Sequence, residues 1–144
     1  MVFTLFGKQK KETKAMASLS YGLDKTYIAD SALLQYSVVL YNTALSGHCT
    51  VPAAASDALI AGVVQEAATA SGDIVRVRKE GITKVLAEGA IAIGNEVGIA
   101  DIRGMVDDTL AAWASGDGVL GVAEETATAS GDIIACWLQI RTVL

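Results

Sequence analysis

The sequence contains few of the residues on which metal and disulfide sites depend. Its 144 residues include one histidine, two cysteines and one proline. Cys49 and Cys136 are far apart and form no CxxC pair, so by themselves they make neither a disulfide framework nor a four-ligand zinc site. We therefore expect two reduced, buried thiols and no bound metal or cofactor.

Long apolar runs and a positive net charge are also missing. The longest apolar run, residues 58–64, is much shorter than the roughly 20 residues of a membrane-spanning helix. The lysines follow the apolar start of the chain, whereas in a secretory signal they precede it. The net charge of −5 argues against a general nucleic-acid binder. We therefore expect no membrane and no nucleic-acid partner.

Apolar residues, by contrast, are abundant. They make up 52% of the chain, whereas charged residues make up 19%, against about 25% in a typical soluble domain. This surplus exceeds what one small core can bury, so it favours association with copies of the chain, most simply as a homotrimer, or with a larger assembly.

Charge divides the chain at about residue 30. Residues 1–30 hold five lysines and three acidic residues, a net charge of +2, whereas the rest holds six basic and thirteen acidic residues, a net charge of −7. Residues 7–26 show no sustained apolar period. We expect residues 1–30 to be an extended N-terminal arm, either a partner-binding segment or a frayed end, and residues 31–144 to form the folded domain. The arm residues expected to bind a partner are Val2, Phe3, Leu5, Phe6, Lys8, Lys10, Lys11 and Lys14.

The folded part looks duplicated. Residues 62–75 and 121–134 are identical at ten of fourteen positions, at an offset of 59. The same offset, without a gap, pairs residues 37–40 with residues 96–99. We expect two copies, at about 33–77 and 92–136, joined by a hairpin-like segment over 78–91. Two repeats are too few for a solenoid, so a single domain with internal pseudo-twofold symmetry is favoured.

Local patterns favour strands over helices. Val75 and Val77 alternate with arginines, and in the second copy the inward positions are Ile134, Cys136, Leu138 and Ile140. Residues 82–87 form a further expected strand between two Glu-Gly pairs. Short strands with glycine turns predict an all-β barrel or sandwich. Residues 107–113 are the one segment where a short helix is an alternative, because an aspartate there could cap it.

A Ser-Gly-Asp triplet precedes the last strand of each copy. Glycine supplies a positive φ, and the aspartate bonds to nearby backbone, which is typical of a tight turn. The structural turn residues expected from this pattern are Gly72, Asp73, Gly131 and Asp132.

No constellation of residues indicates catalysis. His48 is beside Cys49, but neighbouring side chains in a strand point to opposite faces. The acidic pairs 107–108 and 124–125 lack a third ligand at a recognisable spacing. Trp113 and Trp137 are either core residues or anchors of a subunit interface. We expect a protein that is not an enzyme.

The order of these motifs resembles that of the bacteriophage capsid decoration, or cement, proteins. The matching features are the Gly-Val strand at 62, the Glu-Gly-Ile at 80–82, the strand at 90–97 and the second Gly-Val-Ala to Ser-Gly-Asp unit at 121–132. The likeness covers about residues 33–140. It departs at Gln35, where the first copy should repeat Gly94. The arm also lies outside the pattern.

The resemblance implies a β-barrel-like or "tulip" domain that binds the outside of a phage capsid, commonly as a trimer. Its partner would be the major capsid protein, whose subunits it bridges to stabilise the shell, and the protein would be made in the host cytoplasm. An arm of thirty residues, fully extended, spans up to about 100 Å, enough to cross a capsomer boundary. Alternatives are another virion subunit, such as a head fibre or tail component, a small enzyme with a site shared between subunits, or a lipoyl- or biotinyl-type carrier barrel with Lys84 as its lysine.

Overall fold

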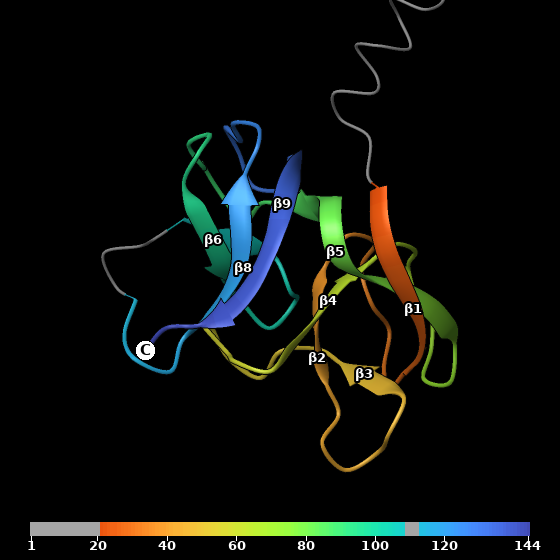
Figure 1. Cartoon of the computed structure of the whole chain (residues 1–144). Helices are drawn as coiled ribbons and strands as arrows, with labels where there is room; N and C mark the ends of the chain where they lie inside the picture. Colours follow the sequence, from red (N-terminus) through yellow and green to blue (C-terminus); the bar gives the residue numbers. More distant parts are fainter. Residues whose placement is uncertain (1–20, 109–112) are drawn as a thin grey trace, which may run out of the picture.

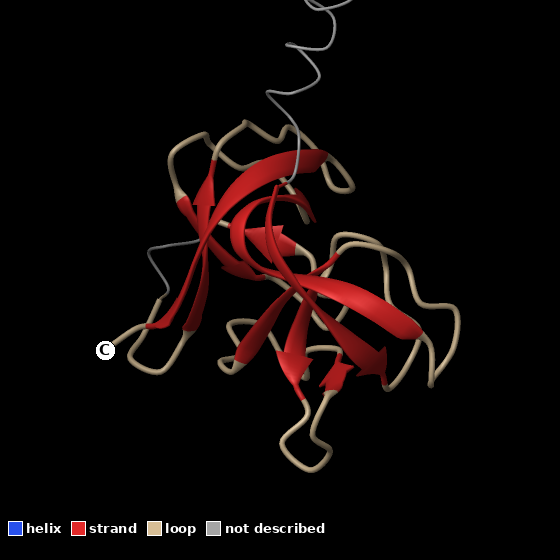
Figure 2. Cartoon of the chain, turned by 45° about the vertical axis from the view of Figure 1, so that its right-hand side comes forward, coloured by secondary structure: helices blue, strands red, loops and turns tan. Residues whose placement is uncertain are grey.

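The structure, a computed structural model, describes residues 21–108 and 113–144, and in these residues all regular structure is β-strand (Figures 1 and 2). This confirms the all-β barrel expected from the sequence. No helix long and apolar enough to cross a membrane is found in the described part of the chain. The strands are β1 (Tyr21–Ala29), β2 (Val38–Tyr41), β3 (His48–Thr50), β4 (Ile60–Val64), β5 (Ile74–Leu86), β6 (Glu96–Ile99), β7 (Val106–Asp107), β8 (Gly118–Ala123) and β9 (Ile133–Thr142).

Five strands close into a first barrel. Their order is β1-β3-β2-β4-β5, and β1 also pairs antiparallel with the first half of β5, which closes the ring. The pair β1–β3 is parallel and short, whereas the other pairs are antiparallel. The described strands of this half therefore form a closed ring.

The second half of β5 continues into a second group of strands. The order there is β5-β9-β8-β6-β7, and a parallel bridge between Ala87 and Val106 brings β7 back to the end of β5. β5 is 13 residues long, so it is the strand that the two groups share. Figure 2 shows the strands in two bundles joined by this long strand.

The core of the described residues consists of two apolar clusters. One apolar cluster fills the first barrel and includes Tyr27, Val39 and Val77. The other joins residues of the second group, such as Leu120, to Val38 and Val63 of the first barrel. All five residues of β4 are therefore buried, because one face of the strand lines the first barrel and the other packs against the second group.

The same backbone hydrogen bonds recur in both halves. The amide of Ala29 donates to the Asp73 carbonyl, and the amide of Ala87 donates to the Asp132 carbonyl, each at 2.8 Å. The two donors, Ala29 and Ala87, lie at the ends of β1 and β5 and are 58 residues apart. The two acceptors, Asp73 and Asp132, precede β5 and β9 and are 59 residues apart. β1 therefore corresponds to the second half of β5, and the first half of β5 corresponds to β9.

This correspondence corrects the alignment at the first strand of each copy. The amide of Tyr36 bonds to the Val64 carbonyl, as that of Gly94 bonds to the Ala123 carbonyl, so Tyr36 and not Gln35 takes the place of Gly94. Tyr36 has a φ of 65° and Gly94 a φ of 87°. A gap-free offset of 59 is therefore wrong here by one residue, and the expected glycine is replaced by a tyrosine in the left-handed region.

Two further expectations are wrong in part, and a third falls mostly on residues outside the described part. Residues 21–29, placed in the arm, are strand β1, with Tyr27 and Ala29 in the core; residues 1–20 lie outside the described residues. Residues 78–91 do not form a hairpin, because β5 runs without a break through Gly81, whose φ of 98° is accommodated opposite Gly22. Asp107 is the last residue of strand β7, and because residues 109–112 lie outside the described part, the alternative of a short helix over 107–113 stays a prediction.

The Ser-Gly-Asp turns have matching geometry. Gly72 has a φ of 97° and Gly131 a φ of 91°. The Asp73 carboxylate accepts bonds from the Thr69 and Ala70 amides at 2.8 and 3.2 Å, and from the Thr69 hydroxyl at 3.1 Å. Asp132 accepts the corresponding bonds from residues 128 and 129. Bonds from the backbone of Thr69 and Thr128 hold the pKa of each carboxyl below its ordinary value of 3.8.

The position of β1 in the core yields a first prediction. A chain that begins at Ser31 lacks β1 and should lose its cooperative thermal transition, whereas one that begins at Tyr21 should melt like the full chain. Truncating one large buried aromatic such as Tyr27 typically costs ~3–5 kcal/mol, already comparable to the ~5–15 kcal/mol stability of a domain. Circular dichroism melting measures both. Cooperative unfolding of the chain from Ser31 would show that β1 is dispensable.

The turn aspartates yield a second prediction, about pH. Because folding lowers their pKa, they stabilise the protein above about pH 3.8, and this stabilisation is lost as the pH falls through the lower folded-state pKa. The double variant Asp73→Asn, Asp132→Asn should melt at a lower temperature at pH 7 and lose less stability between pH 5 and pH 2. The control is the variant Glu88→Gln, which removes an exposed carboxylate outside the two turns. Equal acid sensitivity of the double variant and the native chain would contradict this assignment.

Candidate interaction surface

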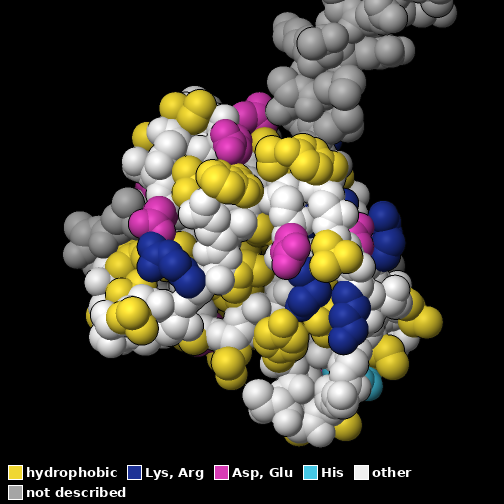
Figure 3. Space-filling model, in the orientation of Figure 1, with side chains coloured by type: hydrophobic (Ala, Val, Ile, Leu, Met, Phe, Trp, Pro, Cys, Tyr) yellow, Lys and Arg dark blue, Asp and Glu magenta, His cyan; other side chains and the backbone are white. Residues whose placement is uncertain are grey.

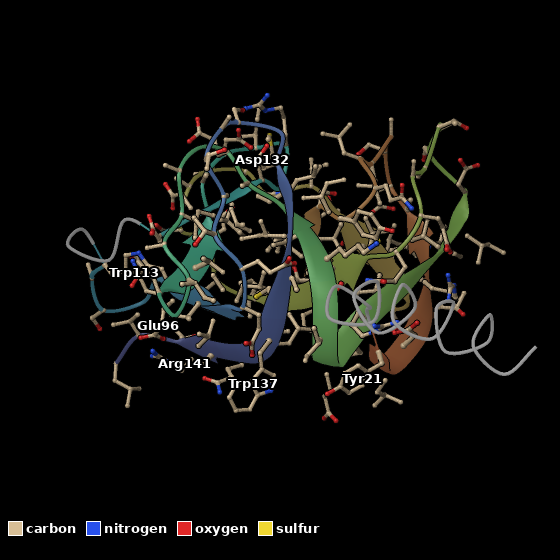
Figure 4. All side chains as sticks on the ribbon, turned by 90° about the horizontal axis from the view of Figure 1, so that it is seen from above. Tyr21, Glu96, Trp113, Asp132, Trp137 and Arg141 are labelled. Atoms are coloured by element: carbon tan, nitrogen blue, oxygen red, sulfur yellow. The ribbon has the colours of Figure 1, made fainter. Side chains whose placement is uncertain are left out.

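An apolar row crosses four neighbouring strands on the outer face of the sheet. The strand registers place Tyr21 opposite Ile82, Ile82 opposite Trp137, and Trp137 opposite Val122. Directly opposed residues in antiparallel strands point to the same face, so these four side chains form one cross-strand stripe. Figure 4 shows Tyr21 and Trp137 projecting from the same side of the molecule. The stripe lies where β5 passes from the first barrel to the second group.

Two members of the stripe are well exposed. The exposed fraction is 64% for Tyr21 and 48% for Trp137, and Ile82 and Val122 are half-buried between them. Aromatic side chains at this level of exposure are typical anchors of protein interfaces. Figure 3 shows that apolar side chains on this face are interspersed with acidic and basic ones.

Ion pairs border the stripe in two places. Beyond Val122 the next residue in the row is Glu96, whose carboxylate pairs with Arg141 (Figure 4). Along β5 from Ile82, Arg78 pairs with Asp24 of β1 and also donates to the Ile82 carbonyl at 2.9 Å. An apolar centre with a charged border is the usual anatomy of a protein–protein interface.

The second tryptophan lies elsewhere. Trp113 is half-buried, and its ring lies over Gly98 of β6 so closely that a Cβ at Gly98 would come within 3.2 Å of it. Figure 4 shows it well away from Trp137. Of the two tryptophans singled out in the sequence, the structure therefore places Trp137 on an open face and Trp113 in a packed position.

The residues considered for chemistry are held in other roles. His48 is bonded through Nδ1 to Asp30 at 2.7 Å, whereas Cys49 is buried in the core of the first barrel. Burial raises the pKa of Cys49 to about 11 and that of Cys136 to about 12, so neither thiol ionises at neutral pH. The two cysteines are not bonded to each other.

The acidic pairs serve turns and strands. Asp108 accepts bonds from the Ala92 amide and the Asn95 side chain, each at 3.0 Å, and Glu125 accepts one from the Ala135 amide at 2.8 Å. Within residues 21–108 and 113–144, no group of three or more His, Cys, Asp or Glu side chains is arranged to hold a metal ion.

Some sequence expectations cannot be placed, and some surface residues escaped sequence analysis. The arm residues from Val2 to Lys14 lie outside the described residues, and Gly72, Asp73, Gly131 and Asp132 lie in the two turns described above. The sequence patterns do not single out Tyr21 and Ile82 as members of an interaction surface, because they place Tyr21 in the arm. Matching residues 21–29 with 79–87 at an offset of 58 would have indicated a strand there, although Ala29 and Ala87 are the only identical pair.

The fold defines an all-β molecule in which a closed five-stranded barrel shares its longest strand with a second strand group. It is similar to the crystal structure of the head fibre gp8.5 N base of bacteriophage phi29, with a TM-score of 0.63 and 20% sequence identity over 85% of this chain and 97% of that one. At this level of identity the likeness shows a common fold. No protein-family model matches the sequence, and no curated protein matches it.

Proposed function

We propose that this chain is a non-enzymatic structural protein of a phage virion, bound to the outside of the head, where it stabilises the shell by bridging major capsid protein subunits. The observation that carries the proposal is the likeness of fold to the phi29 head-fibre base over almost the whole of that domain. The motif order that resembles capsid decoration proteins supports the same place in the virion.

A second candidate is the base of a head fibre, which the structural likeness to the phi29 head-fibre base favours. Both candidates attach a β domain to the head surface. They differ in consequence, because a decoration protein strengthens the shell, whereas a fibre base need only hold a projecting fibre.

In this proposal the N-terminal segment is the attachment element. Val2, Phe3, Leu5 and Phe6 are apolar side chains that a groove of the shell would bury, and the lysines at 8, 10, 11 and 14 would face acidic shell surface. Charge pairing of this kind makes binding weaker as the salt concentration rises.

Co-sedimentation with empty, undecorated heads of a phage that carries this sequence tests the proposal. The full chain should sediment with the heads, and the decorated heads should resist heat better than bare heads. The chain that begins at Tyr21 should bind roughly tenfold more weakly or worse, because it lacks the apolar segment.

The other outcomes separate the alternatives. Binding without any gain in shell stability, with the protein seen at the foot of fibres in electron micrographs, supports the fibre base and overturns bridging. Labelled protein on tails, or no binding to any part of the particle, overturns the head assignment. Equal binding by the chain from Tyr21 moves the attachment surface to the β domain.

We further propose that the cross-strand stripe is the contact between copies in a homotrimer. The double variant Tyr21→Gln, Trp137→Gln should lower the mass measured by light scattering from trimer to monomer, because each substitution removes an exposed aromatic anchor. The matched control is Ile102→Gln, whose side chain is 61% exposed but lies in a loop away from the stripe. A native chain that stays monomeric at all concentrations overturns the trimer, and an unchanged trimer in the double variant moves the contact elsewhere.

A further inference from the structure

The open end of the first barrel holds a polar cavity of about 440 Å³. Side chains of β1 and β2 and the loop between β2 and β3 line it, and Lys79 of β5 is bonded to two of the lining residues, Tyr27 and Tyr41. The mouths of barrels are common places for small-molecule sites, and the volume falls in the range of such sites. Its lining includes Lys25, Tyr27, Tyr41, Thr43, Ser46 and His48.

A lysine behind this lining, Lys79, organises the two tyrosines. The Lys79 ammonium donates to the hydroxyls of Tyr27 and Tyr41, each at 2.8 Å, and to the Ala61 carbonyl at 2.9 Å. These three bonds use all the protons of the ammonium, and each phenol accepts one of them. The Tyr27 hydroxyl also bonds to Tyr41, which leaves the Tyr41 proton to donate to a ligand. The bond from Lys79 also lowers the pKa of Tyr41, which makes its hydroxyl a stronger donor.

The mouth carries an excess of positive charge. The ammonium groups of Lys25 and Lys79 lie 5.2 and 5.1 Å from the centre of the Tyr27 ring. Within the described parts of the chain neither lysine forms an ion pair with a carboxylate. The nearby carboxylate, Asp30, is bonded to His48 and to the Asn42 side chain.

The second strand group shows that the fold does not require this polarity. By the correspondence of the two halves, Lys25, Tyr27, Tyr41 and Lys79 match Thr83, Val85, Ile99 and Leu138. These four counterparts are buried, and three are aliphatic. The second group therefore forms the same strand arrangement with apolar side chains at these positions. Partly burying the ammonium of Lys79 costs free energy that burying a leucine does not. The polar mouth thus serves something other than folding.

We propose that the mouth of the first barrel binds a small anionic ligand, a carboxylate or phosphate group carried on a hydroxylated body of about sugar size. Lys25 and the Tyr41 hydroxyl bind the anionic group, and Lys79 positions the tyrosines and supplies charge from behind. Thr43 and Ser46 provide hydroxyls for the body of the ligand. This site is independent of head attachment, so it is tested on the isolated protein.

The test titrates the full chain with three probes: glucuronate, glucose 6-phosphate and neutral glucose. Calorimetry gives the affinity, and nuclear magnetic resonance follows the signals of Tyr41 and Gly47. At least one anionic probe should bind saturably and roughly tenfold or more tightly than glucose, because hydrogen bonds to charged groups are about twice as strong as neutral ones. Which anionic probe binds better distinguishes a carboxylate ligand from a phosphate ligand.

Matched variants decide whether the mouth is the site. Lys25→Gln should weaken binding of the anionic probe roughly tenfold, and Tyr41→Phe should weaken it while the ring remains. The control is Lys84→Gln. The native Lys84 ammonium lies 6.0 Å from the centre of the Tyr36 ring, outside this cavity, so this variant should bind the probe as the native chain does. The double variant Tyr41→Ile, Lys79→Leu copies the second group and should keep the fold, checked by melting, while losing the probe.

The proposal is overturned if no probe binds, if glucose binds as tightly as the anionic probes, or if Lys25→Gln binds unchanged. It is also overturned if the double variant folds and still binds the probe, because the polar cluster would then have no part in recognition.

Discussion

The structure depends on one continuous strand. β5 pairs with β1 and β4 through its first half and with β9 through its second, so both strand groups take their register from it. Near its middle Gly81 faces Gly22, and a Cβ on either residue would overlap the opposite backbone, at 2.2 Å from the Tyr21 carbonyl oxygen for Gly81. At the neighbouring Ile82, β5 pairs with Tyr21 of β1 on one edge and with Trp137 of β9 on the other, so β1 and β9 flank β5 at the junction. The cross-strand stripe lies on the outer face of this junction because the same three strands meet there.

Sharing a strand also joins the two strand groups through one set of packed residues. A barrel of about sixty residues alone buries too little surface to be comfortably stable. Here β4 is buried on both faces, so residues of the first barrel complete the core of the second group. The apolar surplus in the composition is partly consumed by this internal contact, and the exposed remainder includes Tyr21 and Trp137.

The sequence was sufficient to predict the class of fold and the inward faces of the best strands. Val75 and Val77 are buried as alternation predicts, and so are Ile134, Cys136 and Leu138. The boundary of the N-terminal arm was wrong because β1 carries Lys25 and Thr26 among its apolar residues, which hides its period. The one-residue shift at Tyr36 was missed because a tyrosine occupies a left-handed position where glycine is expected. Both signals are long-range, since they depend on which strand lies beside which, and local propensity does not contain that information.

The cavity could not be predicted for the same reason. Lys25, Tyr41 and Lys79 are distant in sequence, and only the closure of the first barrel brings them to one end. The two halves share a strand arrangement but differ in the side chains at equivalent positions, so comparing them shows which side-chain properties the fold needs. Buried aliphatic residues at 85, 99 and 138 show that the fold requires only apolar filling at this level of the barrel. The first barrel has an apolar cluster of its own around Val39 and Val77, and its polar open end lies beside that cluster.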